Sequence, residues 1–336
     1  MSRSRLIILL SAATAVVVAV SVAAFVVARG QFQEQSSAQP TSTAAGSAVL
    51  SVPHITFRNA TISAEYGTLA AVTLADPKGP RAFFGISCER QTSNRNGGVC
   101  VRADRGVVTS YELLTLDANL KEIGATPLNG TPSRVRMSAD ASLVATTTFV
   151  TGHSYADTAF VTEAIIHQNG QSLGNLEQWQ ATVDGRPLLA ANRNYWGGTF
   201  AADEDTFYVT AAVGQTTWLM KGSVTKRTLT SLRTDVECPA LSPDGTKLGY
   251  KKRLGNPTPG VWRLAVLDLK TNIETILAET RNVDDQVEWL DDNHVLYQLP
   301  RSGSDATVTD IWSVPADGTG APELLIPEGS SPAVIR

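Results

Sequence analysis

One candidate for chemistry in this sequence is a possible serine nucleophile. The string Gly152-His-Ser-Tyr-Ala156 comes nearest to the G-x-S-x-G elbow of serine hydrolases, in which the serine sits on a strand-to-helix turn. The string lacks the second glycine, and no helical pattern follows it. We therefore expect a plain loop here, with a binding role for His153, Tyr155 and Asp157 as the alternative.

The densest acidic group of the chain is a candidate metal site. It contains two aspartate pairs and a histidine: Asp284, Asp285, Asp291, Asp292 and His294. The predicted strand 287–290 separates the two pairs and, at 3.3 Å per residue, holds them roughly 15 Å apart. No calcium loop of the D-x-D-x-D-G type occurs. We therefore expect solvated turn and rim acids, no metal and no cofactor.

The three cysteines divide into a spaced pair and a single residue. Cys88 and Cys100 flank the polar, glycine-rich segment QTSNRNGG. In an oxidising compartment they would close a loop that stabilises the fold by about 3 kcal/mol, so we expect a disulfide; two buried free thiols are the alternative. Cys238 has no histidine beside it in sequence, and we expect a buried strand residue rather than a nucleophile.

The elements that must position these side chains are β-strands. From residue 55 onward the patterning has period two between turn signals, as in Thr206–Val213, Val261–Leu269 and Asp310–Val314. No segment carries apolar residues at helical spacing over a length that demands a helix. The folded part of the chain is therefore predicted to be all-β and to begin near Pro53.

One motif recurs along this all-β part. Its clearest copy, Leu241–Tyr250 (LSPDGTKLGY), reads as a strand end, a Pro-Asp-Gly turn and a new strand. The apolar residue before each turn falls at positions 101, 137, 200, 241, 289 and 334, at intervals of 36, 63, 41, 48 and 45 residues. A repeat in the forties with four short strands is typical of a β-propeller, and six copies predict six blades.

The two ends of the folded segment complement each other. The final half-copy, Ser331–Arg336, lacks following strands, whereas residues 55–86 form strands without a preceding motif. We therefore predict a six-bladed β-propeller closed by pairing of the C-terminal strand with the first blade, which leaves no open edge. The insertion in the longest repeat, 137 to 200, is predicted to mark a functional rim.

The innermost strands of a propeller line its axial channel. Counting back from the repeat positions places Gly97 and Cys100 on the inner strand of blade 2. The same count puts four charged residues on inner strands: Arg136, Glu237, Asp285 and Glu288. These residues are candidates for binding a ligand or partner, with Tyr195 and Trp196 as an aromatic wall; the alternative is that the charges solvate the channel or pair with each other. We expect Trp262, Trp289 and Trp312 to pack between blades.

The repeat resembles the propeller domain of the TolB family. The likeness rests on SPDG followed by an apolar strand and on Asp310–Gly320 (DIWSVPADGTG); it is strongest over residues 236–336 and patchy over 97–235. TolB's separate N-terminal α/β domain has no counterpart, and the wider pattern is similar to small anchored TolB-like propellers of actinobacteria. The resemblance implies a scaffold that binds partners, although the same repeat occurs in peptidase propellers.

The N-terminus carries a predicted membrane anchor. Leu6–Ala28 contains no charge, and a helix of this length spans roughly 34 Å, enough to cross a bilayer core. Arg3 and Arg5 precede it, so residues 1–5 are predicted to be a cytoplasmic stub and everything after the anchor to lie outside. A cleaved signal, which would make the protein secreted, is the alternative. Residues 29–52 are predicted to be a flexible tether and residues 53–336 the propeller.

Composition narrows the function further. The chain has 28 Lys+Arg against 32 Asp+Glu, which excludes the basic excess of nucleic-acid binding, and 43% hydrophobic residues exclude wholesale disorder. We predict a membrane-anchored, extracytoplasmic and non-catalytic scaffold for an envelope protein or peptide. The alternative is a hydrolase or lyase with its site at the channel mouth.

Overall fold

The computed structural model describes residues 17, 20–21, 43–150, 161–254 and 261–336. The predicted stub, most of the predicted anchor and tether, and His153, Tyr155 and Asp157 lie outside these residues. Within the described part of the chain, no helix has the length and apolar character needed to cross a membrane. The described residues of 43–61 and 67–336 form one compact unit, to which residues 62–66 do not belong.

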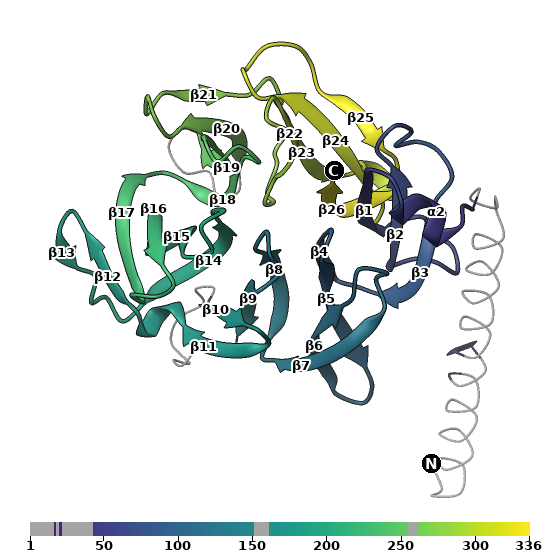
Figure 1. The fold of residues 1–336 in the computed structure, drawn as a ribbon, viewed down its shortest axis with the longest axis horizontal. Coiled ribbons are helices and arrows are strands. Elements are labelled where there is room, and N and C mark those ends of the chain that lie inside the picture. The colour runs from purple at the N-terminus through teal and green to yellow at the C-terminus, as the bar shows by residue number, and fades with distance from the viewer. Residues whose placement is uncertain (1–16, 18–19, 22–42, 151–160, 255–260) are drawn as a thin grey trace, which may run out of the picture. The chain divides into compact units, whose positions relative to one another are not determined.

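The larger unit is a ring of six sheets, so the predicted all-β, six-bladed propeller is confirmed (Figure 1). Blade 1 contains β26 (Gly329–Ile335), β1 (His54–Asn59), β2 (Thr68–Thr73) and β3 (Ala82–Ser87). Blade 2 contains β4 (Arg90–Asn94), β5 (Gly97–Arg105), β6 (Thr109–Leu116) and β7 (Glu122–Leu128). Blade 3 contains β8 (Thr131–Met137), β9 (Leu143–Val150), β10 (Val161–Gln168) and β11 (Gln171–Asn175).

The other three blades follow the same plan. Blade 4 contains β14 (Arg193–Phe200), β15 (Thr206–Val213), β16 (Thr216–Ser223) and β17 (Thr228–Thr234). Blade 5 contains β18 (Glu237–Leu241), β19 (Lys247–Arg253), β20 (Trp262–Asp268) and β21 (Glu274–Ile276). Blade 6 contains β22 (Glu288–Asp291), β23 (His294–Pro300), β24 (Thr309–Pro315) and β25 (Glu323–Ile326).

The inner strands β26, β4, β8, β14, β18 and β22 surround the centre of the ring (Figure 1). We call the side on which these strands begin the start face, and the side on which they turn into the next strand the turn face. On the turn face, hydrogen bonds of 3.0–3.1 Å join the turns of neighbouring blades: Asn94 to Ser138, Asp140 to Glu204 and Asp244 to Asp292. At these three junctions, the turn after the inner strand therefore ties its own blade to the next one.

The motif of blade 2 lies one strand away from its predicted place. Val101 lies on β5, the second strand, so Gly97 and Cys100 do not belong to the inner strand. The inner strand is β4, and the turn that follows Asn94 carries asparagine and arginine instead of Pro-Asp, which concealed it. With Asn94 as the strand end, the interval to Met137 becomes 137 − 94 = 43 residues, in line with the other blades.

Two segments outside the repeat cover sheet edges. The short helix α2 (Gly46–Leu50) buries Val49 against Ala71 and Ala82 of blade 1, so packing begins earlier than the predicted Pro53. In blade 4, the insertion forms the 3-10 turn η1 (Leu176–Gln178), β12 (Gln180–Val183) and β13 (Arg186–Pro187), and β12 pairs in parallel with β17. This insertion protects an outer strand that would otherwise be an open edge. A second 3-10 turn, η2 (Gly303–Asp305), lies in blade 6.

The apolar core is divided among the six junctions between neighbouring blades, with one cluster at each. Trp289 is fully buried between blades 5 and 6, and its Nε1–H donates to the carbonyl oxygen of Ala240 at 2.8 Å. Trp312 packs on the same cluster, whereas Trp262 lies under the Lys251 ammonium group, 4.4 Å from its ring centre. Each blade is therefore held chiefly by its two neighbours.

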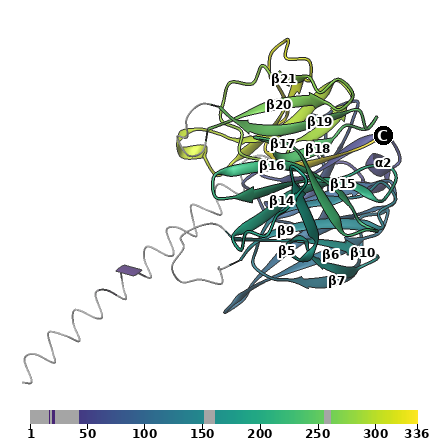
Figure 2. The same cartoon turned by 90° about the vertical axis from the view of Figure 1, so that its left-hand side faces the viewer.

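The hairpin of β5 and β6 is the longest regular hairpin of blade 2. Its strands stay in register up to the pair Arg105 and Thr109, which leaves only Gly106, Val107 and Val108 in the turn. In the side view this blue hairpin forms a pointed projection at lower left, away from the C-terminus (Figure 2).

The predicted disulfide is confirmed. Cys88 and Cys100 are bonded, with their Cα atoms 5.5 Å apart, in the apolar cluster between blades 1 and 2. Both residues are essentially fully buried. The bond joins the segment before β4 to the second strand of blade 2.

Replacing both bonded cysteines, Cys88→Ala with Cys100→Ala, should lower the free energy of unfolding by about 3 kcal/mol, because the unfolded chain loses the loop constraint. Urea unfolding without reductant measures the difference. Cys238→Ala, which removes a buried thiol without a crosslink, controls for the loss of packing. A double variant no less stable than that control would contradict the expectation.

Candidate functional site in the axial channel

An ion pair spans the channel between blades 3 and 6. Asp285, which precedes β22, lies 3.1 Å from Nη2 of Arg134 on β8 and accepts a hydrogen bond of 2.8 Å from Nη1 of Arg90 on β4. Blades 3 and 6 are three positions apart in either direction around the ring, so the Arg134–Asp285 pair crosses it (Figure 1). All three side chains are largely buried.

A second pair crosses at another height. Arg136 forms an ion pair with Glu288 of β22, and its Nη2 donates to the carbonyl oxygen of Val287 at 2.7 Å. Arg134 and Arg136 are two residues apart on one strand, so both face the channel about 6.6 Å apart along it. We refer to Arg134–Asp285 and Arg136–Glu288 as the crossbars.

A third charged group lies on blade 5. Glu237 pairs with Nη2 of Arg253 at 3.2 Å and with Nζ of Lys251 at 3.5 Å. Lys251 also pairs with Asp284, the residue before the first crossbar, and stacks on Trp262. The channel therefore holds an alternating set of positive and negative charges in which each named group has an opposite charge in contact.

Amide side chains complete the network where the inner strands are irregular. Register shifts in β14 and β18 leave backbone carbonyl groups for side chains to satisfy. Nε2 of Gln286 donates to the carbonyl oxygens of Pro239 at 2.9 Å and Gly198 at 3.2 Å. On the other side, Nε2 of Gln91 donates to the carbonyl oxygen of Ser331 at 2.6 Å. The inner strands are thus linked by side chains that reach between blades.

The electrostatics favour permanent charges in this network. Burial alone would raise the pKa of Asp285, but the guanidinium groups of Arg134 and Arg90 outweigh it and hold this pKa at about 2. Burial lowers the pKa of Lys251, but Cys238 and the carboxylates of Asp284 and Glu237 raise it above its ordinary value overall. Asp285 and Lys251 therefore both keep their charge near neutral pH, whereas an acid–base catalyst would need to change its charge there.

The predicted site residues are only partly brought together. Four of them, Arg136, Glu237, Asp285 and Glu288, lie in the channel network, each within an ion pair. This agrees with the alternative interpretation, in which the channel charges pair with each other.

The two predicted aromatic residues do not form a joint wall. Tyr195 is fully buried in the cluster between blades 3 and 4, where burial raises its pKa to about 12. Its neighbour Trp196 is half-buried on the same strand, β14, and successive side chains on a strand point to opposite sides. Tyr195 thus belongs to the core.

Four basic residues of the network were not predicted: Arg90, Arg134, Lys251 and Arg253. Arg90 was missed because the inner strand of blade 2 had been assigned to β5. Lys251 lies on β19, a second strand, and its long side chain reaches inward to Glu237 and Asp284. An alignment of the blade turns that accepted Asn94 as the strand end would have placed Arg90 in the channel.

The acidic cluster is divided between the two ends of β22, as predicted, but the expectation of a solvated acid is wrong for Asp285, which is 5% exposed and pairs with two arginines. Asp285 is held at one end by arginines, whereas Asp291 accepts a hydrogen bond of 2.7 Å from the Asn293 backbone N–H at the other end. Among the residues that the structure describes, no three His, Cys, Asp or Glu side chains are grouped to hold a metal ion.

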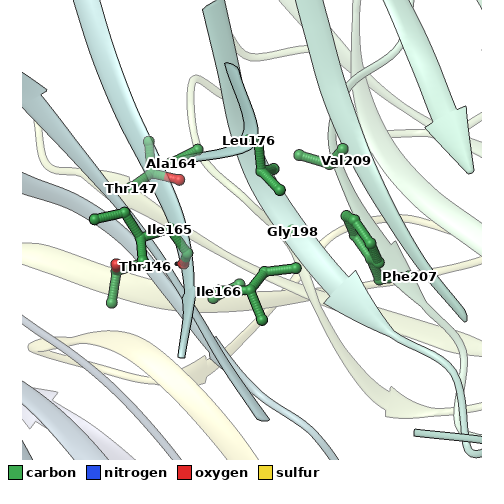
Figure 3. A pocket seen from close by; sticks show the side chains of 10 residues that line it. Thr146, Thr147, Ala164, Ile165, Ile166, Leu176, Gly198, Phe207 and Val209 are labelled. Atoms are coloured by element: carbon green, nitrogen blue, oxygen red, sulfur yellow. Dashed lines mark hydrogen bonds between the residues drawn. The ribbon is translucent and has the colours of Figure 1, made fainter. Parts of the chain in front are cut away.

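A small cavity lies between blades 3 and 4 (Figure 3). Its lining is mainly apolar and includes Ala164, Ile166, Leu176, Phe207 and Val209. It has room for about one water molecule, so it is a packing defect rather than a ligand site.

Comparison with known proteins supports the fold. The chain is similar to the crystal structure of TolB from Acinetobacter baumannii, with a TM-score of 0.59 and 18% identity over 84% of this chain and 67% of that one. It is also similar to a chain of a nidogen–laminin complex, with a TM-score of 0.54 and 9% identity over 84% of this chain and 98% of that one. No family model and no curated protein matches the sequence. The chain therefore has a TolB-like propeller fold.

Asp285→Asn should lower the free energy of unfolding at pH 7 by about 3 kcal/mol, because it leaves Arg90 and Arg134 buried without their counter-charge. A folded-state pKa of about 2, below the ordinary 3.8, means that the carboxylate stabilises the fold fully above about pH 5. This contribution is lost as the pH falls through 4 toward 2. Urea unfolding of both proteins across this range measures the difference.

The matched control is Asp104→Asn, which neutralises an exposed carboxylate. It should change stability little at any pH. A stability difference for Asp285→Asn that stays constant down to pH 2 would contradict the assignment of its effect to the ion pairs.

Proposed function

We propose that this chain is a membrane-anchored, extracytoplasmic propeller that binds a protein or peptide partner at the cell envelope without catalysing a reaction on it. The observation that carries the proposal is the pair of crossbars. They occupy the place where a channel enzyme would admit substrate, and they pair the groups that would act as its acids and bases. A channel closed by ion pairs favours binding of a partner by the loops on the two faces of the propeller.

Two features support the proposed location at the membrane, outside the cytoplasm. A disulfide that is buried in the fold is typical of proteins that mature in an oxidising compartment, which supports a location outside the cytoplasm. The charge-free segment Leu6–Ala28, preceded by Arg3 and Arg5, supports an anchor with its N-terminus in the cytoplasm.

We infer that the pairing of β26 with β1 closes the ring of this scaffold. The two strands pair from His54 opposite Ile335 to Asn59 opposite Gly329, with one register shift between Thr56 and Arg58. Ile335 is 5% exposed, and the Arg336 side chain donates to the carbonyl oxygen of Trp289 in blade 6 at 3.1 Å. This pairing supports a closed ring, in which no inner strand is left as an open edge.

Ile335→Ala should therefore lower the free energy of unfolding by about 2–3 kcal/mol, the usual effect of truncating a buried isoleucine. Ile273→Ala, at an isoleucine that is 63% exposed, is the control and should change it by less than about 0.5 kcal/mol. Thermal or urea unfolding of both variants measures the effect. Equal and small changes would mean that the last strand does not close the ring.

The partner is tested by photo-crosslinking in intact membranes, with benzoylphenylalanine at Thr216 on the start face or at Lys270 on the turn face. Both positions are exposed: Thr216 is the first residue of β16, and Lys270 lies in the turn after β20. We expect one of them to capture the same envelope protein or peptide reproducibly, and the other to serve as its control. Fractionation of the same cells should leave the full-length chain in the membrane after salt washing.

Failure at both positions, together with turnover of esters, lactones or oligosaccharides by the purified protein, would favour the hydrolase or lyase alternative. Recovery of the intact chain in the soluble fraction would contradict the proposed membrane anchor. It would not affect the conclusion drawn from crosslinking about a partner.

A further inference from the structure

The channel network carries more positive than negative charge. Among the described residues its cations are Arg90, Arg134, Arg136, Lys251 and Arg253, and its anions are Glu237, Asp284, Asp285 and Glu288. Asp285 is shared by two arginines, and Glu237 is shared by Lys251 and Arg253. Each group therefore has an opposite charge in contact, while the network as a whole keeps one positive charge in excess.

The excess is larger in the buried part of the network. The side chain of Asp284 is 52% exposed, whereas the side chains of the other members are 6% to 28% exposed. Water screens a half-exposed carboxylate, so Asp284 compensates the buried cations only in part. Because a buried charge without full compensation is unfavourable, this set of side chains favours one further negative charge.

The cations of the network do not lose their protons near neutral pH. A guanidinium group stays protonated in proteins. Burial lowers the pKa of Lys251, but Cys238 and the carboxylates of Asp284 and Glu237 raise it above its ordinary value overall. The positive charges are therefore permanent, and only an added negative charge balances them.

The hydrogen bonds of the network show the same imbalance. Three of its guanidinium N–H groups are buried without an acceptor from the protein, namely Nε of Arg134, Arg136 and Arg253. Within the described part of the network, no carboxylate oxygen is buried without a donor. A water molecule can accept a hydrogen bond from such a group but adds no charge, whereas an anion supplies both the acceptor and the charge.

Two of the cations converge from blades on either side of blade 4. Burial lowers the pKa of Arg134 of blade 3 and of Lys251 of blade 5, and neighbouring negative groups raise both pKa values overall. Asp284 and the Cys238 side chain are among these neighbours for both cations. The ammonium group of Lys251 lies 4.4 Å from the ring centre of Trp262. The two cations therefore meet in the start-face half of the channel, where one anion can interact with both.

We propose that the start-face half of the channel binds one small monovalent anion between Arg134 and Lys251, with Arg253 as a further donor. The ligand class is a chloride ion or a carboxylate group, since each carries one negative charge and accepts several charge-assisted hydrogen bonds. A carboxylate of the proposed peptide partner would offer the same chemistry and would place that partner on the start face. The site itself does not depend on the proposed function.

The test titrates the full chain in detergent micelles with sodium chloride, while sodium isethionate, a bulkier sulfonate, keeps the ionic strength constant. The protein should broaden the NMR resonance of chloride, and excess bromide should remove the broadening by competition. Chloride should also raise the Tm in a saturable manner, by roughly 2–4 °C for millimolar affinity. The same titration with sodium acetate probes the carboxylate.

Two network variants should change the chloride affinity in opposite directions. Arg253→Gln removes the excess positive charge and one donor, and should weaken binding about tenfold or more. Asp284→Asn removes the half-exposed carboxylate that competes for Lys251, and should strengthen binding about twofold to fivefold. Both variants keep Glu237 next to Lys251. The matched control is Arg95→Gln, at an exposed arginine in the turn after β4, which should leave the affinity unchanged.

The outcomes separate this site from other effects of salt. Absence of both the line broadening and the saturable Tm shift in the unaltered chain would overturn the proposal, and rapid alkylation of Cys238 in that case would identify its thiolate as the missing charge. Equal weakening by Arg253→Gln and Arg95→Gln would also overturn it, because chloride would then respond to surface charge in general. If Arg253→Gln failed to fold, the tighter binding expected of Asp284→Asn, at a half-exposed side chain, would still decide the question. A response to acetate alone would support a carboxylate ligand and exclude free chloride.

Discussion

The crossbars between β8 and β22 are the interaction on which the rest of this propeller depends. Each apolar cluster joins two neighbouring blades, so apolar packing by itself makes a chain of nearest-neighbour contacts around the ring. The Arg134–Asp285 and Arg136–Glu288 pairs instead connect blades that are opposite each other. Because a largely buried charge without its partner is strongly unfavourable, these pairs set the distance across the ring.

This constraint extends into the backbone of the inner strands. Gly197 has φ +69°, and a Cβ atom there would lie 2.7 Å from the Cα of Cys238 on the neighbouring strand. Cys238 itself has φ +53°, and its N–H donates to Oγ1 of Thr210 at 2.8 Å. The irregular stretch of β14 and β18 lets the two strands approach, and it leaves the carbonyl oxygens that Gln286 binds. The same irregular backbone therefore allows the inner strands to pack closely and provides the carbonyl groups that the channel side chains bind.

Much of the architecture could be predicted because a propeller blade is a local structure. Four strands and their turns lie within a short stretch of chain. The SPDG turn at Ser242 can be recognised in the sequence, because Asp244 accepts hydrogen bonds from residues of its own turn. The asparagine turn of blade 2 performs the same task with other residues, so its register was wrong and Arg90 was missed. The pairing of Arg136 with Glu288 joins residues 152 positions apart, and no local pattern encodes such a contact. Tyr195 and Trp196 also could not be placed from the repeat alone. Counting back from the repeat positions puts both on the inner strand, but the alternation of side chains along a strand points them to opposite sides.

A channel filled by paired charges leaves the periphery of the molecule as the surface that can vary without disturbing the centre. Network residues are constrained by one another, because changing one leaves its partner buried and unpaired. The departures from the repeat lie elsewhere: β12 and β13 extend blade 4 on its outer side, and the β5–β6 hairpin extends blade 2 beyond its sheet. These additions do not alter the inner strands. The fold thus separates a centre that holds six blades at fixed positions from an outer surface on which new contacts can be added one blade at a time.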